Sequence, residues 1–205
     1  DLSVKVDSIE DIPYSSKFSH SSEKASPGFY TVYLEDHDIE VSLTTTERTG
    51  FHKYQFKKGE LQSLIIDLGF AINWDRSTAS QLNIEDATTI SGYRFSTGWA
   101  KNQKVFFVAE LSKPITGKKL LADGNEMSGE SAEGRKTAAQ LFFDAEGGEE
   151  LQVKVALSSV SIANARENLD EGGFNFEEIQ KESAQVWETA LKDIEIKTNL
   201  DSLKT

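Results

Sequence analysis

Alternating apolar and polar residues run through the first three quarters of the chain, a pattern typical of half-buried β-strands. The clearest case is 39–43, where Ile39, Val41 and Leu43 alternate with polar residues, and 151–157 repeats it. Segments of this kind recur about every 8–15 residues with no helical period, which favours an antiparallel sandwich or barrel. We therefore predict an all-β fold, an antiparallel β-sandwich.

The same alternation predicts the other strands. A short run of three isoleucine and leucine residues, 64–66, is expected to be fully buried in its strand. The further strands are expected at 2–6, 29–34, 50–56, 61–68 and 139–144.

Three connections complete this prediction. Residues 69–79 are expected to form a loop, and 116–135 a mobile polar hairpin or excursion, because the latter has few apolar residues. Residues 139–144 and 151–157 are expected to pair as a hairpin across Gly147 and Gly148.

After Ser158 the pattern changes to a helical one. A short helix is expected over 162–169, and a longer one begins after Asn175, which has Glu178 three residues on as in a capping box. Apolar residues then recur at helical spacing. They are Phe176, Ile179, Val186, Trp187, Ala190, Leu191 and Ile194. We expect partial docking of this helix, with Phe174 and Ile179 anchoring its first turn and its later turns leaning outward.

The stretch 91–114 is expected to organise the sandwich. Its run 105–109 (VFFVA) is apolar on both faces, which is typical of a central strand rather than an edge strand. The remaining strands are therefore expected to lie on either side of it.

An aromatic–arginine–aromatic group precedes this run. Tyr93, Arg94 and Phe95 are followed by a turn at Gly98 and then by Trp99. Such a group could hold a sugar or another flat ligand. For the motif taken alone, however, the favoured interpretation is that Tyr93, Phe95 and Trp99 are ordinary members of a sandwich core.

Other candidate ligand contacts lie elsewhere in the chain. Trp74 is in the predicted loop 69–79, and His20 is close enough in sequence to Glu23 for the two side chains to bond. A solvated pair within a loop is the simpler interpretation of His20 and Glu23. No nucleotide-binding loop or nucleophile elbow is present, so the residues alone leave the function open.

Composition limits the partners. The chain has 205 residues and a net charge of −12, which disfavours nucleic acid and anionic membrane surfaces as partners. It has no cysteine, and no apolar run approaches the roughly 20 residues that span a bilayer. Asp1 is not an initiator methionine and begins no signal-peptide pattern, so we expect a processed or excised segment.

Taken together, several segments resemble the N-terminal domain of glycoside hydrolase family 92, the calcium-dependent α-mannosidases abundant in gut Bacteroidetes. Their order and spacing match over about residues 17 to 194, including Ala165, Asn168 and a tryptophan-bearing helix. The opening glycine-rich segment of the family domain has no match. The matching segments are 18–30 (FSHSSEKASPGFY), 49–54 (TGFHKY), 92–94 (GYR), 98–100 (GWA), 105–109 (VFFVA), 112–114 (SKP) and 153–161 (VKVALSSVS).

The resemblance implies a β-supersandwich over 1–161 and helices over 162–205 that lead into an (α/α)6 catalytic domain. In that family the general acid, the base and the calcium ligands come from the catalytic domain, so none is expected in this chain. The implied reaction is hydrolysis of α-linked mannose with inversion, in which a carboxylic acid protonates the leaving oxygen and a carboxylate activates water.

The resemblance also implies a role for the candidate residues. Trp99 or Trp74 would stack on a sugar face, and Arg94, or His20 with Glu23, would contact hydroxyl groups. The implied partners are the catalytic domain and a mannose-containing glycan, in a periplasmic or secreted enzyme acting on α-1,2-linked mannose of N-glycans. The alternatives are a free-standing carbohydrate-binding sandwich and a structural or adhesive surface domain.

Overall fold

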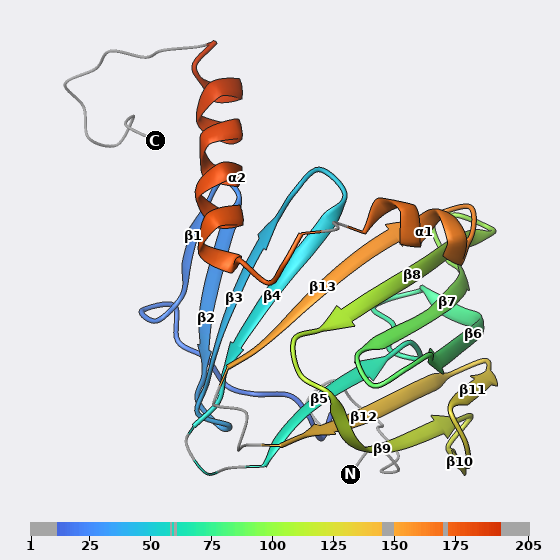
Figure 1. Ribbon diagram of the computed structural model, residues 1–205. Coiled ribbons are helices and arrows are strands. Elements are labelled where there is room, and N and C mark those ends of the chain that lie inside the picture. The colour runs from blue at the N-terminus through green and yellow to red at the C-terminus, as the bar shows by residue number, and fades with distance from the viewer. Residues whose placement is uncertain (1–11, 58, 60, 145–149, 170–171, 194–205) are drawn as a thin grey trace.

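Antiparallel strands build two sheets of unequal size in the computed structural model (Figure 1). The structure describes residues 12–57, 59, 61–144, 150–169 and 172–193, and within them one sheet has nine strands and the other four. The large sheet has the order β1 (Lys24–Ser26), β2 (Phe29–Leu34), β3 (Ile39–Thr45), β4 (Thr49–Gln55), β13 (Glu150–Ser158), β8 (Gln103–Leu111), β7 (Thr89–Thr97), β6 (Arg76–Ile84) and β11 (Ser131–Gly134). The small sheet has the order β10 (Asn125–Met127), β9 (Ile115–Ala122), β12 (Thr137–Phe143) and β5 (Gln62–Asp67).

This architecture confirms the predicted all-β antiparallel sandwich, with helix only after β13. The strands expected at 29–34, 39–43, 50–56, 61–68 and 139–144 correspond to β2, β3, β4, β5 and β12. The run 105–109 lies in β8, which is flanked by β13 and β7 in the interior of the large sheet, as predicted. The strand expected at 2–6 lies outside the described residues.

The core lies between the two sheets. Leucine and isoleucine side chains from both sheets fill it. Its largest fully buried members are Leu82, Ile90, Leu111, Leu120, Leu141 and Leu151. Gly92 of β7 lies so close to β6 that a Cβ atom would be 2.0 Å from the carbonyl oxygen of Gln81, and this close approach requires glycine.

β13 is buried on both faces. Leu151 and Val153 belong to the core, whereas Lys154 points to the other face and is only 3% exposed. Its ammonium group lies 2.8 Å from Glu110 Oε2, donates to the carbonyl oxygen of Gly172 at 2.8 Å and lies 5.1 Å from the ring centroid of Phe174. Lys154 therefore ties the segment that follows the first helix to the centre of the large sheet.

The expectation of a mobile polar hairpin or excursion at 116–135 is wrong in part: β9 and β10 do pair as a hairpin, but the segment is more regular and more buried than its composition suggests. This segment contains most of β9 and all of β10 and β11, and Leu120, Leu121 and Ala132 are buried. Its apolar residues are few, but Leu120, Ala122 and Ala132 face the core, and cross-strand pairing orders the polar remainder.

The expected hairpin of 139–144 with 151–157 is also wrong. β12 belongs to the small sheet and β13 to the large one, so the chain changes sheets between them. Alternation shows which face of a strand is buried, but it does not show which strand lies beside it. The loop expected at 69–79 is shorter than predicted, because β6 begins at Arg76.

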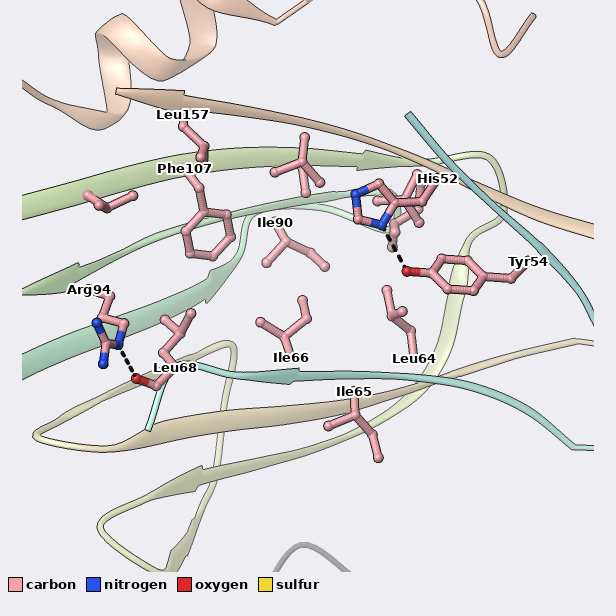
Figure 2. Close-up of a pocket in the computed structure, with 15 residues that line it drawn as sticks. His52, Tyr54, Leu64, Ile65, Ile66, Leu68, Ile90, Arg94, Phe107 and Leu157 are labelled. Carbon is pink, nitrogen blue, oxygen red and sulfur yellow. Dashed lines mark hydrogen bonds between the residues drawn. The ribbon is translucent and has the colours of Figure 1, made fainter. Parts of the chain in front are cut away.

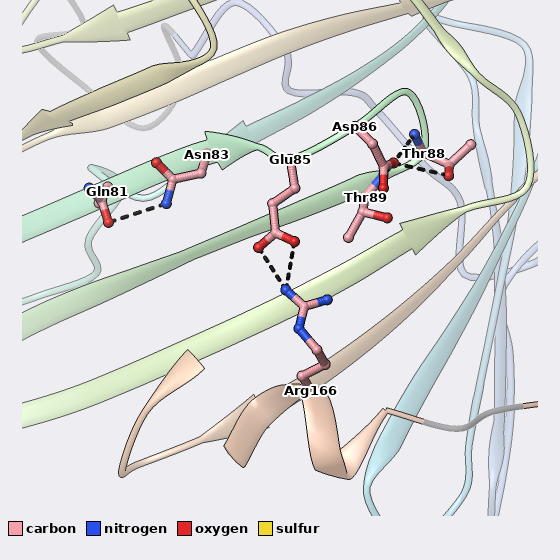
Figure 3. A network of polar contacts seen from close by, with 7 residues as sticks. All are labelled: Gln81, Asn83, Glu85, Asp86, Thr88, Thr89 and Arg166. Atoms are coloured by element: carbon pink, nitrogen blue, oxygen red, sulfur yellow. Dashed lines mark hydrogen bonds and ion pairs between the residues drawn. The ribbon is translucent and has the colours of Figure 1, made fainter. Parts of the chain in front are cut away.

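The helix α1 (Ile162–Asn168) covers part of the outer face of the large sheet. Ser161 caps it by accepting a hydrogen bond from Asn164 N at 3.1 Å. Ala165 packs with Val108 and Ala156 of the sheet. Arg166 reaches both carboxylate oxygens of Glu85, at 2.7 and 2.6 Å, next to the turn between β6 and β7 (Figure 3).

The helix α2 (Phe176–Leu191) begins after Asn175, as predicted, although the Asn175 side chain makes no capping hydrogen bond. Phe176 is 1% exposed and anchors the first turn. The ammonium group of Lys53 lies 4.8 Å from the Phe176 ring centroid and 2.5 Å from Glu177 Oε1. Neither described helix is both long and apolar enough to cross a membrane.

The later turns of α2 lie against the sheet only in part. Ser183 is buried over Gly28, where a Cβ atom would be 2.4 Å from Ser183 Oγ and 3.0 Å from Trp187 Cδ1. Val186 is 66% exposed, Leu191 is also exposed, and the C-terminal half of the helix projects beyond the strands (Figure 1). The helix is therefore partly docked, as expected, and Phe176 is its anchor.

We predict that Phe176→Ala lowers the free energy of unfolding by about 3–5 kcal/mol, because it removes a buried aromatic side chain from a packed site. Val186→Ala, on the exposed side of the same helix, should change it by less than about 0.5 kcal/mol. Urea denaturation of both variants measures the difference. Equal losses at the two positions would contradict the partial docking of α2.

Candidate functional site

The aromatic–arginine–aromatic group is split between the two faces of β7. Successive side chains of a strand point to opposite faces. Arg94 therefore lies on the inner side, where it lines a pocket between the sheets, and Tyr93 and Phe95 lie on the outer side (Figure 2). Their rings stack at 4.5 Å between centroids, and Phe106 lies edge-on to Phe95 at 5.5 Å. The three residues do not converge on one ligand, and both aromatic rings lie outside the core between the sheets.

Trp74 and Trp99 form an exposed aromatic pair, which we call the tryptophan platform. Trp99 is 91% exposed and Trp74 is 56% exposed, so neither is a core residue. Their ring centroids are 6.4 Å apart and their planes are inclined by 33°. They come from two different connections, the one between β5 and β6 and the one between β7 and β8. Two large rings that remain exposed side by side are available for stacking on a flat apolar surface.

Arg94 holds the first of these connections in place. Its Nε donates to the carbonyl oxygen of Leu68 at 3.0 Å (Figure 2). Its Nη2 donates to the carbonyl oxygen of Phe70 at 3.3 Å and to Oδ2 of Asp75. The hydrogen bond from Arg94 is the main cause that lowers the pKa of the Asp75 carboxyl group. These hydrogen bonds fix the backbone of the connection that carries Trp74, and contact of Arg94 with a sugar stays a prediction.

Gly98 brings the second connection against the first. Its amide donates to the carbonyl oxygen of Ala100 at 3.0 Å, which closes the turn that carries Trp99. A Cβ atom at Gly98 would lie 3.0 Å from Asp75 Cα, closer than most side chains tolerate. The glycine therefore permits the close approach that places the two tryptophans together.

His20 and Glu23 form a second polar group. His20 Nδ1 lies 2.7 Å from Glu23 Oε2, and the Tyr30 hydroxyl donates to Glu23 Oε1 at 2.7 Å. The hydrogen bond from Tyr30, followed by that from His20, lowers the pKa of Glu23. The His20 ring also lies edge-on to Phe18 at 5.5 Å. The hydrogen bond that the sequence allowed between His20 and Glu23 is present, and the imidazole is almost fully exposed, as in the simpler interpretation of a solvated pair.

The two groups are not one site. Glu23 precedes β1, whereas Arg94 lies on β7, and five strands separate β1 from β7 in the large sheet. Six strand spacings of about 4.8 Å place them roughly 29 Å apart across the sheet. The structure thus brings together Trp74, Trp99 and Arg94, and it leaves His20 and Glu23 elsewhere.

No candidate metal site is found in the part of the chain that the structure describes. It holds no group of three histidine or acidic residues suited to a metal ion. Asp38, beside His37 in the β2–β3 turn, accepts instead from Tyr33 at 2.6 Å and Lys57 at 2.7 Å. These residues do not form a calcium site, because calcium takes six to eight oxygen ligands.

The sequence matches the family model described as the glycosyl hydrolase family 92 N-terminal domain over residues 2–158. That is most of the chain. The chain belongs to this family.

Solved structures of family 92 enzymes agree with this assignment. The α-mannosidase BT3965 from Bacteroides thetaiotaomicron is 30% identical and superposes with a TM-score of 0.82 over 90% of this chain and 26% of its own. The family 92 enzyme ccman5 is 25% identical, with a TM-score of 0.78 over 90% of this chain and 26% of its own. The inverting mannosidase BT2199 from the same Bacteroides species, at 24% identity, shares the fold with a TM-score of 0.78 over 91% of this chain and 25% of its own.

No curated protein matches the sequence. The chain spans about a quarter of the length of these family 92 structures.

Two features of this family 92 domain were not found from the sequence. Asp75 was not recognised as the partner of Arg94, because 19 residues separate them and no local pattern joins them. The pocket beside β5 was also missed, because the Leu64–Ile66 run predicted a fully buried strand. The residues are instead only partly buried on an edge strand.

We predict that the tryptophan platform gives an exciton couplet in the far-ultraviolet circular dichroism spectrum, because its indoles lie 6.4 Å apart. Trp99→Phe should abolish the couplet. Arg94→Lys should weaken it, since lysine cannot reproduce the planar fork that holds two carbonyl groups and Asp75. Arg135→Lys, at an exposed arginine elsewhere, is the matched control. An unchanged couplet in Arg94→Lys would contradict the positioning role of Arg94.

Proposed function

We propose that this chain forms the non-catalytic N-terminal β-sandwich of a secreted or periplasmic α-1,2-mannosidase and shapes a glycan pocket where it meets the catalytic domain. Membership of family 92 and structural likeness to α-mannosidases about four times as long support a partner domain on the same polypeptide. In this proposal 1–161 is the sandwich and 162–205 leads toward the catalytic domain.

The tryptophan platform is the observation that carries the proposed glycan contact. Its two rings are exposed, close together and fixed by Arg94 and Gly98, and such rigid aromatic side chains offer contact area at low entropic cost. The apolar face of a pyranose ring would stack on one indole, and the adjacent saccharide would reach the other. His20 and Glu23 would contact a different part of a glycan or none.

The chemistry of hydrolysis is assigned to the catalytic domain. An inverting glycosidase needs an acid and a base about 6.5–9.5 Å apart with room for a water molecule between them. Asp75 and Glu23 are both occupied as acceptors of internal hydrogen bonds, which makes them poorly suited to this work. Calcium, where the full-length enzyme uses it, would be held by residues of the catalytic domain.

A free-standing carbohydrate-binding or surface-adhesion module is the second candidate. The tryptophan platform is compatible with this candidate too, because stacking on a sugar needs no second domain. The two candidates differ in the parent gene. A reading frame that continues past Thr205 into a catalytic domain supports the mannosidase, and a stop codon there supports the module.

We predict that the chain binds an α-1,2-linked manno-oligosaccharide with a Kd of about 1 mM, typical of a small contact area. Trp99→Ala should weaken binding about tenfold, or about 1.4 kcal/mol, through loss of stacking. Trp187→Ala is the matched control, because it removes the tryptophan of α2 and leaves the platform intact. Isothermal titration of the three proteins decides the point, and equal losses in both variants would refute the platform as the glycan contact.

We also predict that the purified chain does not hydrolyse α-1,2-mannobiose, with or without added calcium, because in this proposal the acid, the base and the calcium ligands belong to the catalytic domain. Release of mannose is measured against the same solution without protein. Turnover that a single Asp→Asn or Glu→Gln substitution in this chain abolishes would overturn the assignment of the chemistry to the catalytic domain.

A further inference from the structure

The tryptophan platform lies at one end of three neighbouring strands of the large sheet. β6 begins at Arg76, which pairs with Thr97 at the end of β7, and β8 begins at Gln103 beside them. Trp74 comes just before β6, and Trp99 lies in the connection between β7 and β8. Side chains that border these strand ends are therefore neighbours of the platform in space.

Three cations border the platform. Arg76 comes two residues after Trp74 in the chain, and Lys101 comes two residues after Trp99. Two residues span at most about 7 Å, so the Cα atoms of both cations lie within about 7 Å of those of the tryptophans. Lys104 is the second residue of β8. All three cations are exposed, and a ligand held on the indoles is within reach of their long side chains.

The charges of these cations are not compensated within the described part of the chain, where none of the three forms an ion pair. Asp75, the carboxylate nearest to them in the sequence, is already bound by Arg94. The ammonium group of Lys104 lies 5.3 Å from the Phe95 ring centroid, a contact that attracts the cation without cancelling its charge. This end of the sheet is therefore locally positive in a chain whose net charge is −12.

Exposed aromatic side chains beside cations also occur in proteins that bind membrane surfaces. Phe70 is 38% exposed and Ile72 is 57% exposed, on the same connection as Trp74. An anionic membrane, however, meets the field of the whole molecule, and the net charge of −12 opposes that approach. A small anion responds mainly to charges within a Debye length, about 8 Å at physiological ionic strength. The local cations therefore favour a small anionic ligand over a membrane.

We propose that the tryptophan platform and its three cations bind an anionic saccharide, one that carries a phosphate or a carboxylate group. The pyranose ring stacks on an indole, and the anionic oxygens accept charge-assisted hydrogen bonds from Arg76 and Lys101. Lys104 adds to the attraction from the neighbouring strand. The proposal rests on the glycan contact proposed for the platform, and it goes further by assigning a charge to the ligand.

Three disaccharides test the proposal. They are α-1,2-mannobiose, the same disaccharide with a phosphate ester at C6, and the same disaccharide with a carboxylate at C6. At low salt, isothermal titration should give at least about a tenfold higher affinity for one of the anionic sugars than for the neutral one. The ratio should fall toward one as added salt shortens the Debye length. The tighter of the two anionic sugars identifies the anion, and equal affinity for all three would overturn the proposal.

Charge-removing variants show whether the named cations are responsible. Arg76→Gln and Lys101→Gln should each lower the ratio of anionic to neutral affinity at least about threefold. Lys181→Gln, at an exposed lysine of α2, is the matched control and should leave the ratio unchanged. An equal fall in all three variants would report only the net charge of the protein, and the proposal would be wrong.

Trp99→Ala separates this proposal from the glycan contact on which it rests, since it should weaken the binding of neutral and anionic sugars alike. If the neutral sugar binds through Trp99 and the anionic groups add nothing, the glycan contact stands and the anionic ligand is refuted. If the anionic sugars bind Trp99→Ala as tightly as the native chain, the platform is not the glycan contact and both proposals fail.

Sedimentation with vesicles of an anionic phospholipid tests the competing partner. The native chain should stay in solution at the salt concentration at which the anionic sugar binds. Sedimentation that Trp99→Ala and Lys101→Gln both abolish would assign this surface to a membrane and overturn the proposal.

Discussion

The unequal size of the two sheets is the constraint on which the rest of the structure depends. A four-stranded sheet covers only part of the inner face of a nine-stranded one, and apolar sheet faces must be buried against something. On the outer face, α1 and Phe176 cover the parts that lie over β8, β13 and β4. On the inner face the small sheet ends, among the described residues, at β5, and the uncovered remainder lines the pocket beside β5. Each covering element of the domain can be understood as a response to this mismatch.

The sequence predicts individual strands well and their arrangement poorly, for a physical reason. Alternation reports the burial of one strand face, which is a local property, so β3 and β8 were located correctly. Pairing and sheet membership depend on contacts between distant residues, so β12 and β13 were wrongly joined as a hairpin. The β9–β11 region shows the second limit. Its few apolar residues suffice because they fall at core positions, and a count of apolar residues does not register that.

The same limit applies to the candidate site: contacts between neighbours in the sequence were predictable, and contacts between distant residues were not. The sequence identified Trp99 and Trp74 as separate candidates, but their pairing depends on two connections that meet only in the folded chain. Arg94 was named as a ligand contact, which stays a prediction, but its hydrogen bonds to Leu68, Phe70 and Asp75 join residues far apart in the sequence and were not foreseen. His20 with Glu23 was a local pair three residues apart, and that bond was predictable because it needs no tertiary information.

Lys154 shows how the sandwich fixes the direction of the chain beyond it. The Lys154 side chain is buried, whereas that of its partner Glu110 is 39% exposed. Such an ion pair adds little net stability, since the cost of removing the ammonium charge from water offsets the attraction, and an apolar residue at a buried site of this kind is often tolerated. The stability of the sandwich therefore does not account for a buried ammonium group at the centre of β13. The contacts of Lys154 with Gly172 and Phe174 explain its burial better, because they hold the segment that leads directly into Phe176 and α2. A methionine in its place would fill the same space and still leave that segment without its anchor. The partly exposed α2 is thus set at a defined angle by a polar interaction, as a helix must be if a second domain is to pack on its outward side.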